Sequence, residues 1–256
     1  MKRPYPSKIS PTPIISAAIE IKFDISCPVD VVYGLVQNAL KQKFPKSQKL
    51  PIAYIPEEIR VQDNLLEQPH YRLFNNDTAY SILVGPKVFA FVYSKNNFDD
   101  TNDYPGWSQF IKQEIMELYK SIFALDFITS VNRLGIRYGD FFDNTNIFDY
   151  TEFNLLDKDG KRKDTAKTQI VQTINKEDTF NNIVISNNST YMINGQIIQG
   201  SMIDIDTFVS EFDDFMNNYE VYLQKCHEVN KELFFEMLKK EFIDTFNPIY
   251  GENYAN

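Results

Sequence analysis

Within the stretch Val131-Asn-Arg-Leu-Gly-Ile-Arg-Tyr-Gly139, apolar side chains at every second position from Leu134 to Tyr138 alternate with arginine and glycine, which is typical of a half-buried β-strand. One face of such a strand carries the apolar side chains Leu134, Ile136 and Tyr138. The other face carries Arg133 and Arg137, with Gly135 between them. Two guanidinium groups on one strand face need carboxylate partners or an anionic ligand. The stretch therefore predicts either an ion-pair clamp inside an α+β domain or the floor of a binding surface.

A second charged alternation, Asp204-Ile-Asp206, places two carboxylates on one strand face. Paired carboxylates can hold a divalent cation or act as an acid and a base, and they can equally receive arginines from a neighbouring strand. We favour the structural interpretation, in which an ion pair with Arg133 or Arg137 would tie the two halves of the chain together. If that pairing is buried, Arg137→Ala should cost about 3–5 kcal/mol.

Sequence patterns on either side of the arginine stretch predict the elements of a first α+β unit, residues 1–145. Strands are expected at 17–25, 70–75, 79–84, 88–94 and 127–140. A helix is expected to begin near Pro28 and end before Pro45. A second helix carries the apolar stripe Trp107, Ile111, Ile115, Leu118 and Ile122. This order favours a mainly antiparallel sheet covered by helices.

The second half of the chain, residues 146–256, repeats this pattern in simpler form. Strands are expected at 167–175, 180–186, 190–194 and 197–206, with turns at Asn187-Asn188 and Asn194-Gly195. A long amphipathic helix follows over about 208–242. A four-strand meander with a long helix predicts a second α+β unit.

The long helix has more apolar surface than one sheet contact requires. Besides its main stripe it carries a second apolar row, formed by Met216, Leu223 and Phe234. We expect this excess to be buried against the first unit or against a second copy of the chain, with a homo-oligomer slightly favoured.

Composition narrows the classes of partner. The 256 residues carry a net charge of −9, which opposes nonspecific binding to nucleic acid and to anionic membranes. No apolar run approaches the roughly 20 residues of a membrane span, and no signal-peptide core follows the basic N-terminus. Only Cys27 and Cys226 are present, too few for a disulfide framework. The sequence therefore predicts a cytoplasmic protein.

Candidate catalytic and metal-binding residues are scarce. Of the two histidines, His227 follows Cys226 on the long helix, where neighbouring side chains diverge too far to share a metal ion. Glu20-Ile-Lys22 matches the end of a metal-dependent nuclease motif, but residues 1–19 contain no acidic residue to complete it. Glycine-rich phosphate loops and the spacing of zinc ligands are also missing. We expect no metal, no cofactor and no catalytic residue.

Several short blocks carry a resemblance to a known family: Pro13-Ile14 before Ala18-Ile19-Glu20-Ile21, Arg133-Leu-Gly-Ile-Arg-Tyr138, Ile203-Asp-Ile-Asp206, and the histidine-bearing last helix with Phe234-Phe235. The chain resembles an uncharacterised, sporadically distributed bacterial family of about this length, and the blocks span most of the chain. The family has no established activity, so no residue role is implied. Its patchy occurrence implies an accessory gene that travels with mobile or phage-defence loci.

These observations predict a non-enzymatic cytosolic binding or accessory protein, such as a component of a phage-defence or toxin–antitoxin locus with a protein partner. One alternative is a chaperone-like protein, because the meander with a long helix resembles the export-chaperone fold. Another is a small-ligand sensor or enzyme that uses Arg133, Arg137, Asp204 and Asp206. These four residues are the candidate binding residues.

Overall fold

A computed structural model describes residues 5–76, 78–95, 104–110, 115–153, 155–163, 167–193 and 195–251, without the side chains of residues 109, 110 and 193. The described strands form a single nine-stranded sheet in the order β2-β3-β4-β5-β1-β6-β9-β8-β7. Every pair of neighbouring strands is antiparallel. The fold is therefore α+β, as the sequence predicts.

The strands are β1 (Ile14–Ile25), β2 (Lys46–Lys49), β3 (Tyr71–Phe74), β4 (Tyr80–Gly85), β5 (Val88–Ser94), β6 (Ile128–Asp143), β7 (Gln169–Lys176), β8 (Thr179–Ile193) and β9 (Gln196–Val209). The α-helices are α1 (Val29–Leu40), α2 (Glu57–Gln62), α3 (Trp107–Phe110), α4 (Met116–Phe123), α5 (Phe215–Met237) and α6 (Lys240–Asp244). The 3₁₀ helices among the described residues are η1 (Pro51–Tyr54), η2 (Leu65–Glu67) and η5 (Ile147–Asp149).

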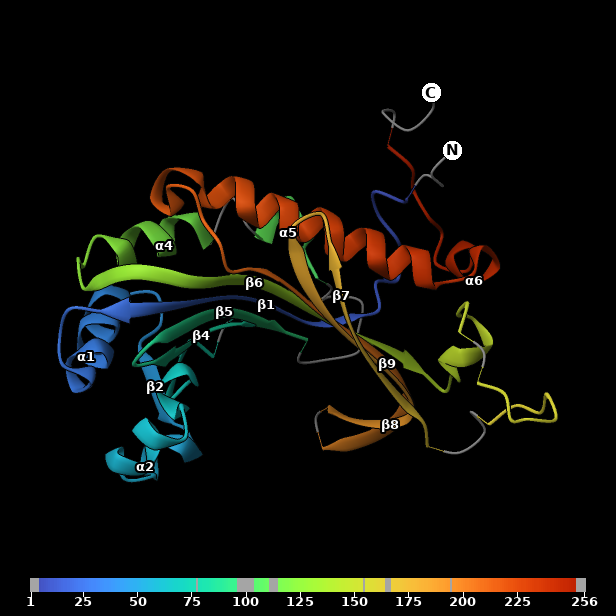
Figure 1. Ribbon diagram of the computed structural model, residues 1–256, viewed down its shortest axis with the longest axis horizontal. Helices are drawn as coiled ribbons and strands as arrows, with labels where there is room; N and C mark the ends of the chain where they lie inside the picture. The colour runs from blue at the N-terminus through green and yellow to red at the C-terminus, as the bar shows by residue number, and fades with distance from the viewer. Residues whose placement is uncertain are drawn as a thin grey trace.

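One face of the sheet is covered by helices. On β1 the side chains of Ile19, Ile21 and Phe23 are buried there, whereas the residues between them are only half-buried. A first apolar cluster joins this face to α1, α4 and the first half of α5, and a second joins β8 and β9 to the rest of α5 and to α6. Figure 1 shows α5 lying along the sheet, so one helix contacts both clusters.

The expectation of two separate sheets is wrong. Strand β6 pairs with β9 from Leu134↔Val209 to Asp143↔Gly200, and this ladder crosses the predicted boundary between residues 145 and 146. In two separate sheets, β6 and β9 would each be an edge strand with unpaired backbone groups. Their pairing with each other satisfies these groups.

Some predicted elements of the second half also differ. The strands predicted at 180–186 and 190–194 are one strand, β8, with a register shift between Ser186 and Ser189. Residues 167–209 therefore form a three-strand meander, not four. The helix predicted over 208–242 begins only at Phe215 and is followed by the separate helix α6. Ile111 of the predicted helical stripe and Asn194 of the predicted turn lie outside the described residues.

The second apolar row of the long helix is mostly covered within the chain. Leu223 is 1% exposed in the first cluster and Phe234 is 8% exposed in the second, whereas Met216 is 53% exposed. The sheet thus covers most of the surface that motivated the prediction of a homo-oligomer. Among the residues that the structure describes, none of the helices has the length and apolar character needed to cross a membrane.

Candidate functional site

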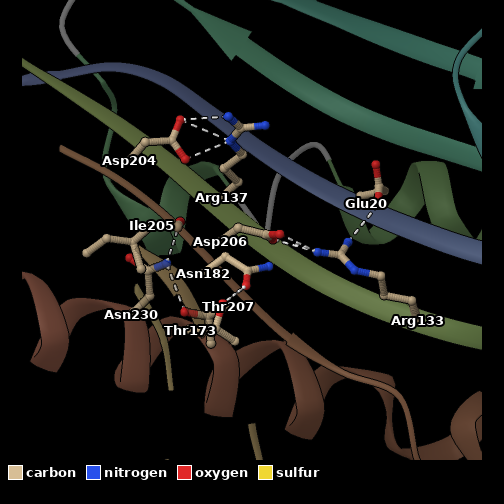
Figure 2. Close-up of polar contacts among 10 residues, drawn as sticks. All are labelled: Glu20, Arg133, Arg137, Thr173, Asn182, Asp204, Ile205, Asp206, Thr207 and Asn230. Atoms are coloured by element: carbon tan, nitrogen blue, oxygen red, sulfur yellow. Dashed lines mark hydrogen bonds and ion pairs between the residues drawn. The ribbon is translucent and has the colours of Figure 1, made fainter. Parts of the chain in front are cut away.

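The four candidate residues lie together on the face of the sheet opposite α5. Arg137 on β6 is the register partner of Asp206 on β9, and Gly139 is the partner of Asp204. Glu20 on β1 approaches from the other side, opposite Gly135. Figure 2 shows the two arginines pointing toward carboxylates from neighbouring strands. The charged side chains of two stretches that are distant in the sequence thus form one polar surface.

Arg133 is at the centre of this surface. Its Nη1 donates to Oε1 of Glu20 at 2.6 Å, and its Nη2 donates to both carboxylate oxygens of Asp206 at 2.6 and 2.7 Å. The guanidinium also lies 4.3 Å from the centre of the Phe208 ring, a cation–π contact. A Cβ at Gly135 would lie 2.7 Å from Nη1 of Arg133, so glycine is what allows the guanidinium to lie flat across β6.

Arg137 makes a separate pair with Asp204. Its Nε donates to the two carboxylate oxygens at 2.8 and 3.0 Å, and its Nη2 donates to Oδ2 at 2.8 Å. The hydrogen bond to Asp204 raises the pKa of Arg137, although burial works in the opposite direction. The side chain of Arg137 is 61% exposed, against 15% for Arg133, so the two pairs differ in their contact with water.

The prediction that an arginine of this strand lies within hydrogen-bonding distance of a carboxylate is confirmed. Both arginines are paired, and both pairs with β9 join the two halves of the chain. Since most of the donors of Arg133 and the carboxylates of Asp204 and Asp206 are used within the network, it favours structural ion pairs over an anion-binding pocket. A polar row continues to the sheet edge, where Thr173 donates to Asn182 at 3.0 Å (Figure 2).

Glu20 and Lys22, which match the end of a metal-dependent nuclease motif, have different partners in the structure. Glu20 pairs with Arg133, whereas Lys22 pairs with Glu67 at 3.3 Å. Within the described part of the chain, no group of three or more histidine, cysteine, aspartate or glutamate residues is placed to hold a metal ion.

The histidine of the last helix lies in a half-buried aromatic network that the sequence does not reveal. His227 stacks on Trp107 with ring centres 4.1 Å apart, and its Nδ1 lies 3.4 Å from the Tyr138 hydroxyl. The Tyr138 hydroxyl in turn lies 3.1 Å from that of Tyr104. Burial, with a smaller effect of Lys231, lowers the pKa of His227 to about 3, so the imidazole is neutral at physiological pH. The imidazole ring is therefore packed between Trp107 and Tyr138.

The adjacent thiol is equally unsuited to catalysis. Cys226 is buried in the first apolar cluster, and burial raises its pKa to about 12. A thiol with so high a pKa is protonated at neutral pH and is a poor nucleophile.

Sequence reasoning missed an open groove of about 600 Å³ at the end of the β7–β8 hairpin. Its walls are residues 175–180, residues 209–213, and Tyr222 and Lys225 of α5. None of the four candidate residues lines it. The sequence feature that could have indicated this groove is the acidic character of two loops, Glu177-Asp178 and Glu211 to Asp213. Only the pairing of β8 with β9, however, shows that the two loops are neighbours.

Comparison of the chain with known protein families gives no matching family model, and comparisons with curated proteins and with solved structures give no match either. The resemblance to the sporadically distributed bacterial family therefore stays a prediction.

Proposed function

We propose that the protein is a non-enzymatic binding protein whose acidic groove receives a basic segment of a protein partner. The observation that supports this is the groove beside α5, in which four carboxylates and three aromatic rings converge. The four candidate ion-pair residues hold the sheet together in this proposal, and binding takes place at the sheet's end.

The charge of the groove suits a cationic partner. The acidic residues along its walls are Glu177, Asp178, Glu211 and Asp213. The two lysines of the walls have carboxylate partners within the chain: Lys225 pairs with Asp178 at 3.0 Å, and Lys176 pairs with Glu232 and Glu236 at 3.1 and 2.8 Å. The groove therefore keeps a negative balance, which attracts basic side chains and steers their approach.

Aromatic rings give the groove apolar surface and rigidity. Phe180 is 39% exposed and stacks on Phe208, with ring centres 5.4 Å apart. The Tyr222 hydroxyl accepts a hydrogen bond from the Asp213 amide at 2.7 Å and donates to the Asp213 carbonyl at 3.0 Å, which fastens the 209–213 segment to α5. Rings beside carboxylates are suited to arginine and lysine side chains, whose stems pack on the rings while their charges pair.

The resemblance supplies the biological setting of this proposal. An accessory gene of phage-defence or toxin–antitoxin loci would encode a cytoplasmic component that acts by binding another protein. Self-association through the 208–242 region, which the sequence predicts, competes with self-association through any other surface of the chain, and the exposed side chains of Met216 and Val221 on α5 are available for it.

Site-specific photo-crosslinking in the native host tests the proposed groove. A benzophenone side chain at Phe180 should capture a basic protein, whereas the same group at Tyr54, an exposed aromatic residue on η1, should not. The double variant Glu211→Lys/Asp213→Lys should abolish capture at position 180. The matched double variant Glu57→Lys/Glu58→Lys on α2 should leave it unchanged. The proposal fails if the captured protein is acidic, or if both positions capture the same proteins.

A chaperone-like function is the second candidate, favoured by one apolar pair. Met192 and Ile197 are cross-strand partners near the tip of the β8–β9 hairpin, and each is 70% exposed. Exposed apolar side chains on a projecting ribbon could contact unfolded chains. If this is their role, the protein should slow the aggregation of an unfolded client, and Met192→Ser/Ile197→Ser should remove that effect without lowering stability.

A further inference from the structure

Strand β7 is at the end of the sheet, and no described strand lies along its outer side. Among the strands that the structure describes, it is the last in the sheet order and pairs only with β8. Five of its eight residues are exposed: Gln169, Val171, Gln172, Thr173 and Asn175. An edge strand presents unpaired backbone groups that can bond to another strand.

The pairing with β8 shows which residues direct these groups outward. The Asn187 amide donates to the Thr168 carbonyl at 3.1 Å, which places Thr168 among the residues that bond to β8. Antiparallel strands alternate between residues that bond to the neighbour and residues that turn their backbone groups away. Four residues of β7 therefore turn their N–H and C=O groups outward: Gln169, Val171, Thr173 and Asn175.

The opposite edge of the sheet has features that oppose pairing with a further strand, and β7 lacks these features. Strand β2 has four residues, and both of its ends are lysines, Lys46 and Lys49. Short length and lysine are common devices against edge pairing. Strand β7 has eight residues and no charge from Gln169 to Asn175, and its terminal Lys176 has carboxylate partners on α5.

We infer that β7 pairs antiparallel with β7 of a second copy of this chain and continues the sheet across a two-fold axis. With the axis at Gln172, Val171 lies opposite Thr173 of the second copy, and Gln169 lies opposite Asn175. All of these residues direct their backbone groups outward, so every facing pair can exchange two hydrogen bonds. No like charges face each other, and the side chain of Val171, which is 65% exposed, becomes covered.

The size of the edge sets the expected affinity. Two eight-residue strands bury less than the roughly 1,200 Å² of a standard interface, so we expect a dimer with a dissociation constant in the micromolar range. Sedimentation velocity from about 1 to 200 µM, a range chosen to bracket that constant, should show monomer converting to dimer. A purely monomeric mass throughout that range would overturn the inference and leave a strand of another protein as the occupant.

A pair of matched variants separates this interface from one on α5. Val171→Lys places two lysines near each other across the axis and should raise the dissociation constant at least tenfold. Val221→Lys on α5 changes the same residue type at the same exposure, 65%, and should have no effect. The reverse result would assign self-association to α5 and overturn the edge pairing.

A disulfide tests the register. Gln172 faces its own copy at a non-hydrogen-bonded position of the proposed ladder, where Cα atoms are about 4.5 Å apart and a disulfide can form. In a Cys27→Ser background, which removes the half-buried native thiol, oxidised Gln172→Cys should therefore become a covalent dimer. Gln48→Cys on β2 should stay monomeric under the same conditions. Failure of Gln172→Cys to cross-link at concentrations where the dimer is populated would overturn the inferred pairing.

Discussion

The two faces of β6 and β9 are built from the same two strands but stabilised by different interactions. On the covered face, Leu134, Ile136 and Ile205 are at most 1% exposed. On the open face, Arg133 and Arg137 are held by directional hydrogen bonds to carboxylates. Apolar burial depends on area, whereas an ion pair depends on geometry and on how much water reaches it. The covered face should therefore contribute most of the stability, and the open face should specify which strands pair.

The largest expected effect is on the covered face. Ile205→Ala should lower the free energy of unfolding by about 3 kcal/mol, because it removes a fully buried side chain and leaves a cavity. Val171→Ala, at a position 65% exposed, should change it by less than about 0.5 kcal/mol. Urea denaturation of both variants measures the difference. Equal losses would mean that α5 does not pack on β9 as described.

The second prediction distinguishes the two arginines. Arg133→Ala should cost about 2 kcal/mol, because it leaves Glu20 and Asp206 facing each other without the cation that joins them. Arg137→Ala should cost about 0.5 kcal/mol, because its side chain is 61% exposed and its loss opens Asp204 to water. A loss of about 3–5 kcal/mol was expected if the Arg137–Asp204 pair were buried. The side chain of Asp204 is 12% exposed, but that of Arg137 is 61% exposed, so only one partner meets this condition. Urea denaturation at low and high salt should give this order, and a larger loss at Arg137 would contradict it.

The third prediction concerns a carboxylate on the covered face. Asp140 is 3% exposed on the same side of β6 as Tyr138, and burial, with a smaller effect of Asp204, raises its pKa well above the ordinary value of 3.8. The unfolded chain releases this proton at lower pH than the folded chain. Stability therefore decreases as the pH rises from about 4 toward the raised pKa.

The substitution Asp140→Asn removes the buried carboxyl group and with it the decrease in stability at higher pH. It should therefore stabilise the protein by on the order of 1 kcal/mol at pH 8 and by less at pH 5. Chemical denaturation at the two pH values measures the change. Asp159→Asn in the exposed turn of residues 157–160 should show no such difference. A destabilising effect of Asp140→Asn at pH 8 would show that the charged carboxylate is needed.

Local alternation in the sequence was sufficient to predict most strands and the chemistry of the open face. The strands expected at 17–25, 79–84 and 88–94 match β1, β4 and β5 closely. The pairing of the arginine strand with Asp204 and Asp206 was expected as one possibility, because side chains of opposite charge on two strand faces attract each other. The register that produces it pairs Arg137 with Asp206, far away in the sequence, and local patterns contain no information on such pairing.

The remaining differences arise where one residue type suits two structures. Asn188 has a φ of 46°, which asparagine tolerates both in a hairpin turn and in a bulge, and here it lies at the register shift inside β8. Phe208 fits the helical spacing of the last stripe, but it belongs to β9, where it stacks on Phe180. In both cases long-range strand pairing overrides the local pattern, and the groove formed by those pairings could not be predicted either.

The course of α5 has a consequence for how the molecule opens. Cys226 and Val229, less than one helical turn apart, belong to different apolar clusters, and Asn230 donates to the Ile205 carbonyl at 2.9 Å. Unfolding one cluster would remove the helix that covers the other. Thermal denaturation should therefore be a single cooperative transition, and the most protected amides of β1 and β9 should exchange their hydrogens with the same free energy.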